Sequence, residues 1–168
     1  MDSHDILLDA FGRVRDDVHG AVEGLEEAAL TFRADKDANT IAWLIWHLSR
    51  VQDDHVAEVA GIEQVWTSGG WVERFGLPFD KSAHGYGQSS SDVAAVKADA
   101  ALLLGYFDAV HQQTMNYVDG LKDADLDRVV DERWDPPVTL GVRLVSVVND
   151  CTQHAGQAAF VRGLTERR

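Results

Sequence analysis

The sequence predicts an all-α protein: a four-helix bundle, up-down-down-up, with a long crossover between its second and third helices. Apolar residues recur at three- and four-residue steps in four segments, and no segment has the two-residue alternation of a convincing strand. About thirty residues separate the second segment from the third, too many for a simple hairpin turn. One long crossover of this kind is typical of up-down-down-up bundles.

The first two helices are defined by their caps and their apolar faces. The first is expected to begin near Ser3, a residue type that caps helices well. The second follows Asn39 or Thr40 as its cap and runs to about Ala60, before Gly61. Only a few residues around "RADKD" join them, so we expect antiparallel neighbours. The apolar face of the first helix comprises Ile6, Leu7, Ala10, Phe11, Val14, Val18, Val22 and Leu25.

The third and fourth helices complete a single domain over residues 1–168. The third is expected over roughly 92–118, after the segment "SSSD". The fourth is expected from about Leu140 to Arg162, before Gly163, because the two prolines of "WDPPVT" cannot lie inside a helix. A length of 168 residues suits one domain with room for a core.

Composition excludes several classes of function. The chain is 45% apolar and 26% charged, as soluble globular proteins are. No apolar run reaches the roughly 18 residues of a membrane span, and the acidic N-terminus does not resemble a signal peptide. A single cysteine suits a reducing compartment, so we expect a cytoplasmic protein without membrane contact. The net charge of −13 argues against nucleic acid as a partner.

Three polar residues interrupt the apolar pattern of the fourth helix: Asp150, Cys151 and His154. Asp150 and His154 are four residues apart, so they project from one face and can hold one metal ion. A charged Asp in a stretch otherwise free of charge must be paired, hydrogen-bonded or metal-bound. Cys151 and His154 form a rival zinc pair, although Cys151 also suits a simple core position. The spacing favours Asp150.

A third ligand is expected from the second helix. His47 lies on its apolar stripe, whereas His55 stands beside two aspartates and is expected to be solvated. His47, Asp150 and His154 together make a two-histidine, one-carboxylate set, which suits Zn²⁺ and leaves coordination positions open. The alternative is a metal-free core in which these side chains are hydrogen-bonded to one another.

Three segments resemble the DinB/YfiT-like metalloprotein superfamily: "NTIAWLIWHLSRVQDDHVAEVAG", "GYG" and "RWDPPVTLGVRLVSVVNDCTQHAGQAAFVRGL". The resemblance covers nearly the whole chain and is strongest to the branch of the mycothiol-dependent S-transferases, related to the N-terminal domain of mycothiol-dependent maleylpyruvate isomerase. It implies a four-helix bundle whose metal is held by three side chains, here His47, Asp150 and His154. The middle ligand is His in many relatives and Glu in the isomerase. Asp is shorter than Glu by one methylene.

The resemblance implies a metal-dependent thiol S-transferase, with a role in detoxification. The expected cofactor is a divalent metal, Zn²⁺ first, and the expected cosubstrate is a small thiol such as mycothiol. A coordinated thiol loses its proton, so it could attack an electrophile at neutral pH. The expected partners are therefore a small-molecule thiol and an electrophile. The resemblance also makes a homodimer possible.

Six further residues are candidates for substrate binding. Arg50 and Asp54 follow His47 by one and two turns, and either bind the thiol or pair with each other at i, i+4, which we favour. Gln157, a turn beyond His154, is a candidate to support the metal ligands. The long crossover is expected to cover one end of the bundle and either wall a pocket or plug the core. Its aromatic residues would shape a pocket for the electrophile: Trp66, Trp71 and Tyr86.

Two other functions fit the same ligand set. A metal ion lowers the pKa of its bound water toward about 7, so the protein could hydrolyse an ester or amide without a thiol. A non-catalytic, stress-associated protein that binds metal or a second subunit is the other possibility.

Overall fold

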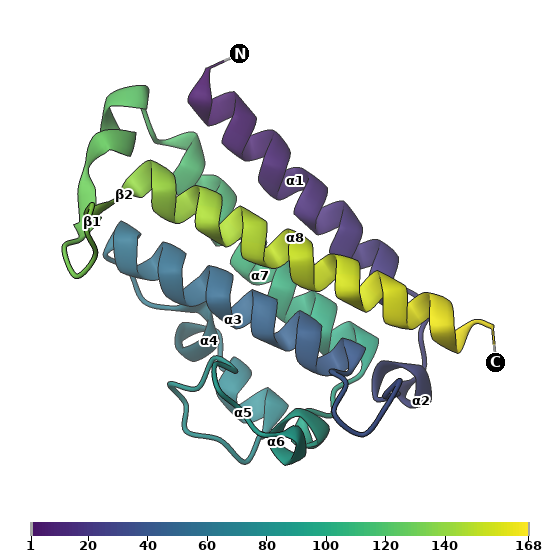
Figure 1. Ribbon diagram of the computed structural model, residues 1–168. Helices are drawn as coiled ribbons and strands as arrows, with labels where there is room; N and C mark the ends of the chain where they lie inside the picture. Colours follow the sequence, from purple (N-terminus) through teal and green to yellow (C-terminus); the bar gives the residue numbers. More distant parts are fainter. Residues whose placement is uncertain (1, 168) are drawn as a thin grey trace.

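The computed structural model describes residues 2–167, which form a bundle of four long helices: α1 (Ser3–Val22), α3 (Ile41–Ala60), α7 (Ala100–Asp119) and α8 (Leu140–Thr165) (Figure 1). Helices α1 and α8 run in one direction, and α3 and α7 run in the other. The all-α, up-down-down-up prediction is confirmed. The prediction of one domain over 1–168 includes Met1 and Arg168, which lie outside the described residues. In the part of the chain that is described, every helix is too short or too polar to cross a membrane.

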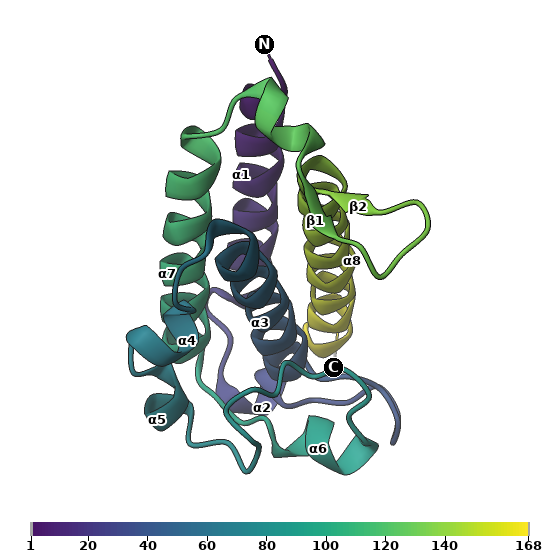
Figure 2. The ribbon, with the colours of Figure 1, turned by 90° about the vertical axis from the view of Figure 1, so that its left-hand side faces the viewer.

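The first two long helices lie diagonally across the bundle, so the expectation that they are neighbours is wrong. Each packs along both α7 and α8, and α1 and α3 touch each other at few positions (Figure 2). Residues 23–40 connect them and include the short helix α2 (Glu27–Leu30). This connection is long enough to pass under the end of the bundle.

The helix ends follow the side chains that cap them. Asp2 caps α1, so the predicted cap Ser3 is the first helical residue, and Leu25 lies beyond the end of the helix. Thr40 caps α3 as expected, since its hydroxyl accepts from the Trp43 amide at 3.0 Å. Gly61 ends α3 with a left-handed φ of 67°. Helix α8 continues past Gly163 to Thr165 and is capped by Thr139.

The predicted third helix is two helices, α6 (Ser90–Ala95) and α7. The backbone of Val96 leaves the helical region, with φ −76° and ψ 100°. Asp99 then caps α7, because its carboxylate accepts from the Leu102 amide at 2.7 Å. Apolar periodicity continues through the break, so the sequence pattern alone did not show that a cap restarts the helix.

A small antiparallel sheet, which the sequence did not predict, precedes α8. Strand β1 (Val129–Asp131) follows the 3₁₀ helix η1 (Asp123–Asp127) and pairs with β2 (Val138–Thr139). Strands this short have too few residues to show alternation. The loop between them carries Arg133.

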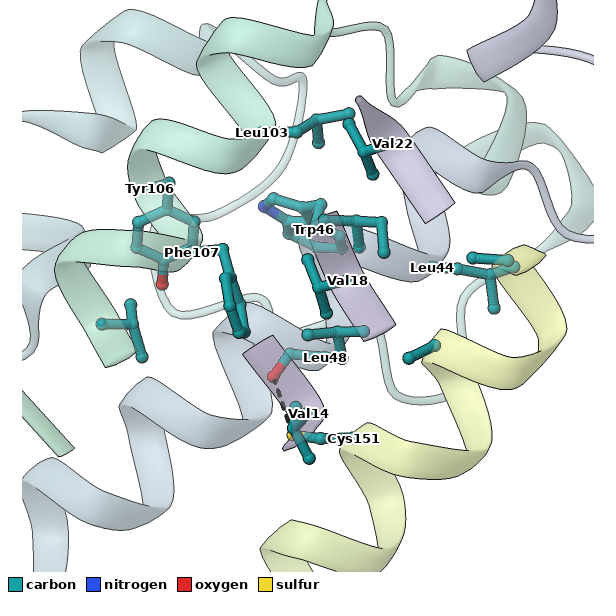
Figure 3. Packing of buried hydrophobic residues seen from close by; sticks show 14 of the residues in the cluster. Val14, Val18, Val22, Leu44, Trp46, Leu48, Leu103, Tyr106, Phe107 and Cys151 are labelled. Carbon is teal, nitrogen blue, oxygen red and sulfur yellow. Dashed lines mark hydrogen bonds between the residues drawn. The ribbon is translucent and has the colours of Figure 1, made fainter. Parts of the chain in front are cut away.

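The core lies between the four long helices (Figure 3). Side chains from three of them meet at its centre: Val14, Val18, Leu48 and Cys151 are all buried there. The crossover adds a second apolar layer with the short helices α4 (Val65–Ser68) and α5 (Trp71–Phe75), which contact α7. Three crossover rings surround the Tyr106 ring: Trp66, Trp71 and Phe75.

A buried polar cluster ties the crossover to α3. Asp53 accepts hydrogen bonds of 2.8 Å from the Val65 amide, the Trp66 amide and the Tyr106 hydroxyl. Its carboxylate lies 3.7 Å from the guanidinium of Arg50, and both side chains have no exposed surface. Burial raises the pKa of Asp53, while the two amides and the hydroxyl oppose that rise.

Replacing Asp53 with Ala should lower the free energy of unfolding by about 3–5 kcal/mol, because it leaves Arg50 buried without its counter-charge. Urea unfolding of the purified variant measures the loss. Asp17→Ala, at an exposed position on α1, is the control and should change stability by less than about 0.5 kcal/mol. Equal effects of the two substitutions would contradict the structural role of Asp53.

His19 should make part of the stability pH-dependent. Its ring nitrogens lie 2.7 Å from Glu23 and 2.9 Å from Asp108, which Arg15 also binds. Burial lowers the pKa of His19, but the two carboxylates raise it above its ordinary value overall. The stabilisation is therefore complete below the unfolded pKa of about 6.5 and is lost as pH rises through the folded pKa. The stability difference between the wild type and His19→Gln should be larger at pH 6 than at pH 8.5 in urea unfolding. The reverse trend would refute this reasoning.

Candidate metal centre

His47 is held in one orientation on the inner face of α3. Its Nδ1 is hydrogen-bonded to the backbone carbonyl oxygen of His84, in the crossover. The Trp43 ring stacks on the imidazole, with centroids 4.6 Å apart and planes 13° from parallel. Because the carbonyl can only accept, Nδ1 carries the proton and Nε2 keeps its lone pair. Burial lowers the pKa of His47, which also favours the neutral ring that metals bind.

Gly85 allows the crossover to come this close to His47. Its φ is +100°, and a Cβ at this position would lie 2.5 Å from His47 Nδ1 and 3.1 Å from Trp43 Cζ2. Both facts exclude an ordinary side chain. Gly85 is the first glycine of the "GYG" segment, and its place against His47 accounts for that segment physically.

His154 is oriented in the same manner on α8. Its Nδ1 lies 2.8 Å from the backbone carbonyl oxygen of Asp150, one turn earlier, so Nε2 is again left with its lone pair. The contact with the Asp150 carboxylate, 3.4 Å from Nδ1, raises the pKa of His154. Burial of Asp150 opposes its ionisation, but His154 keeps the pKa of this carboxyl below its ordinary value. The Oδ2 atom of Asp150 is buried and makes no hydrogen bond with any residue that the structure describes.

The three side chains converge at one point between α3 and α8. The rings of His47 and His154 have centroids 4.7 Å apart and meet edge to face. One ligand atom from each of His47, Asp150 and His154 lies within 4.8 Å of the others. Two imidazole nitrogens with fixed tautomers and one carboxylate oxygen without a hydrogen bond fit a divalent ion such as Zn²⁺. The structure thus brings together the three residues that the sequence analysis selected.

Cys151 lies in the core among buried apolar side chains, with its sulfur toward the Leu48 backbone (Figure 3). Its sulfur lies 3.7 Å from the Leu48 carbonyl oxygen and 3.7 Å from Gln52 Oε1. Complete burial raises the pKa of its thiol far above the ordinary value, and zinc binds the thiolate form. The rival pair of Cys151 with His154 is therefore not formed.

A cavity of about 550 Å³ adjoins Asp150. A second hollow of about 560 Å³ shares four of its lining residues, Asp54, His55, His84 and Arg133. The wall of the first cavity comprises Val51, Asp54, His55, His84, Tyr86, Arg133, Ser146, Val147 and Asp150. Asp54 and Tyr86, two predicted substrate-binding residues, thus line the same cavity as Asp150.

The other four predicted substrate-binding residues lie elsewhere. Arg50 is fully buried and has its ion pair with Asp53 rather than Asp54. Trp66 and Trp71 belong to the apolar layer of the crossover. Gln157 is exposed on α8 and lines a separate hollow. Helical spacing places Arg50 on nearly the same face of α3 as His47, but it does not show that the crossover covers Arg50.

Four polar residues of the wall were not selected from the sequence: His55, His84, Arg133 and Ser146. His84 directly precedes the "GYG" segment, so its neighbours were an available signal. His55 is half-buried in the cavity wall, and the expectation that it is solvated is wrong. Arg133 carried no signal, because the small sheet whose loop holds it was not predicted, and Ser146 carried none as a lone serine on α8.

Replacing Gly85 with Ala should weaken Zn²⁺ binding by about 10- to 100-fold, since the new Cβ displaces the carbonyl that orients His47. Competition against a chromophoric chelator measures the affinity. Gly87→Ala is a matched control, because Gly87 also has a positive φ, +70°, but nothing lies within 4 Å of a Cβ there. If both variants bind Zn²⁺ equally well, the close approach of Gly85 does not set the orientation of His47.

Comparisons with known proteins identify the family of the chain. The family model described as Mycothiol-S-transferase matches residues 6–166. A solved structure, described as that of the conserved protein of a locus from Enterococcus faecalis, is similar with a TM-score of 0.92 and 27% sequence identity, and the match covers 100% of this chain and 99% of that one. No curated protein matches the chain. Because the family model spans nearly all of the described residues, the resemblance seen in the sequence is confirmed, and the chain belongs to the mycothiol S-transferase family.

Proposed function

We propose that this protein is a divalent-metal-dependent S-transferase that presents mycothiol as a thiolate to an electrophile. The observation that carries the proposal is the pair of histidines, His47 and His154. Each has its Nδ1 on a backbone carbonyl, which leaves Nε2 free to bind a metal, and the Asp150 carboxylate has an oxygen without a hydrogen bond. Family membership supports mycothiol as the thiol.

His47, Asp150 and His154 would hold the metal, with Zn²⁺ as the expected ion. When bound, such an ion lowers the pKa of a coordinated thiol, so that the thiolate forms at neutral pH. The ring of Trp43 and the carbonyl of His84 prevent His47 from turning away. These contacts keep the ligands close to their binding geometry before any ion arrives, which reduces the cost of ordering them.

The nucleophile must come from a separate molecule. Cys151 is the single cysteine of the sequence, and it is buried with its sulfur against α3. It therefore cannot reach an electrophile in the cavity beside Asp150. The cavity is lined by two apolar side chains, Val51 and Val147, together with polar groups. This combination suits a small electrophile that carries a polar substituent.

The purified protein should contain about one divalent ion per chain and should join mycothiol to a bimane electrophile. His154→Ala should lose both the metal and the conjugation, because two ligands do not hold the ion tightly. Metal analysis by mass spectrometry and a fluorescence assay measure the two properties. His111→Ala, on α7 and outside the cavity wall, is the control and should retain both.

A panel of thiols separates this proposal from its rivals. Mycothiol should be used faster than bacillithiol, glutathione or cysteine, and chelation should stop the reaction until Zn²⁺ is restored. Turnover of an ester without any thiol would instead favour hydrolysis. Stoichiometric metal without turnover would favour a binding protein. Full activity of metal-free His154→Ala would refute the proposal.

A further inference from the structure

His55 occupies the cavity wall but is not one of the candidate metal ligands. It follows His47 by eight residues on α3, lines both hollows, and has its Nδ1 3.4 Å from the Nη1 atom of Arg143 on α8. A guanidinium can only donate hydrogen bonds, so Nδ1 of His55 is the acceptor. The neutral ring therefore carries its proton on Nε2.

Arg143 is itself fixed by a second partner. Its Nη2 donates to Asp131 Oδ2 at 3.1 Å, and its side chain is only 14% exposed. Asp131 also accepts two hydrogen bonds from the Arg133 guanidinium, at 2.9 and 2.8 Å. Arg133 lowers the pKa of Asp131 strongly, so this carboxylate stays charged and holds Arg143 in place. Asp131 on β1 thus holds Arg143 on α8, and Arg143 sets the tautomer of His55 on α3.

The charges around His55 keep its ring neutral. Burial lowers the pKa of His55, and the neighbouring Arg143 lowers it further. Asp54 and Glu58 act in the opposite direction, and His84 adds to the lowering, with a net shift below the ordinary value. At neutral pH the ring is a hydrogen-bond donor at Nε2 and has no second proton to release.

We propose that His55 is a catalytic residue that donates a hydrogen bond from Nε2–H to the carbonyl oxygen of an α,β-unsaturated electrophile. The inference rests on the proposed function. As the thiol sulfur forms its bond to the β-carbon, the electrons of the carbon–carbon double bond move toward the carbonyl, and its oxygen becomes an enolate. His55 stabilises that charge without giving up its proton. Solvent takes the proton of the thiol and returns one to the α-carbon.

The separation of His47 and His55 favours an electrophile whose oxygen is conjugated with the carbon under attack, over one whose oxygen is bonded directly to that carbon. Eight residues of α-helix rise by about 12 Å, so His55 lies about two turns of α3 away from His47. In an enone the oxygen lies several bonds from the carbon under attack, whereas an epoxide oxygen is bonded to that carbon. Val51 lies between His47 and His55 on α3, and Val147 lies between Arg143 and Asp150 on α8. Both valines line the same cavity. They provide the apolar wall for the carbon skeleton.

The test compares two electrophiles with mycothiol and the metal-loaded protein. One is 2-cyclohexenone, and the other is a chloromethyl bimane, which expels chloride and places no new charge on oxygen. His55→Leu should slow the enone reaction by about 100-fold more than it slows the bimane reaction, because only the enone places new charge on an oxygen. His55→Gln should recover part of the enone rate, because its amide nitrogen also donates. His111→Leu, at a buried histidine outside the cavity wall, should change neither reaction.

A second measurement does not depend on turnover or on the folding of a variant. Nitrogen-15 NMR of the wild-type histidine rings reports the tautomer and charge of His55 at pH 7. The expected result is a neutral ring with its proton on Nε2. A proton on Nδ1, or a charged ring, would overturn the inference whatever the kinetics show.

The outcomes separate this inference from the proposed function. If the wild type conjugates the bimane and His55→Leu slows both reactions equally, or neither, then His55 has no selective role and the S-transferase proposal stands. If the wild type conjugates neither electrophile with mycothiol, both proposals fall.

Discussion

The site depends on one buried ion pair, Arg50 with Asp53. Asp53 holds the start of α4 through the amides of Val65 and Trp66, while Arg50 donates to the Ala83 carbonyl oxygen at 3.1 Å. The next carbonyl along the chain, that of His84, is the one that orients His47. A buried pair of this kind costs desolvation energy, and its clearest benefit is to specify one arrangement among several. Here it specifies how the crossover lies against α3.

The same pair connects the crossover to the cavity. Arg50 donates to Gln64 Oε1 at 2.8 Å, and the amide of Gln64 donates to Asp54 at 2.7 Å. The guanidinium also lies over the Trp66 ring, 5.0 Å from its centroid. A single side chain therefore supports both the ring of one candidate ligand and a carboxylate of the cavity wall. Arg50, predicted to bind substrate, instead positions residues that line the site.

The sequence predicted the features that depend on residues close together in the chain, and it missed those that depend on residues far apart in the chain. Helix periodicity and i, i+4 spacing are local, so the long helices and the pair of Asp150 with His154 were within reach. His47 was found because a titratable residue on an apolar stripe needs a partner. The burial of Arg50 and the wall position of His55 depend on the crossover and the small sheet, whose packing is long-range. A pattern of neighbours within a few positions cannot predict contacts between residues that are far apart in the sequence. Such contacts join Arg50 to Ala83 and His55 to Arg143.

The rotational position of α8 about its own axis determines that the centre has a carboxylate and not a thiolate. A stripe of small and branched residues faces the core at three- and four-residue steps: Leu144, Val147, Cys151, Ala155 and Ala158 are all buried. Asp150 and His154 each precede a member of this stripe by one residue, so they lie at its edge, about 100° around the helix. At that edge Asp150 is shielded enough to leave an oxygen without a hydrogen bond, yet it borders a cavity. Turning α8 by one residue would bring Cys151 to the edge and place Asp150 on the outer side of the bundle. The cost of exposing the apolar stripe prevents that turn, so the packing of alanines and valines selects the chemistry of the site.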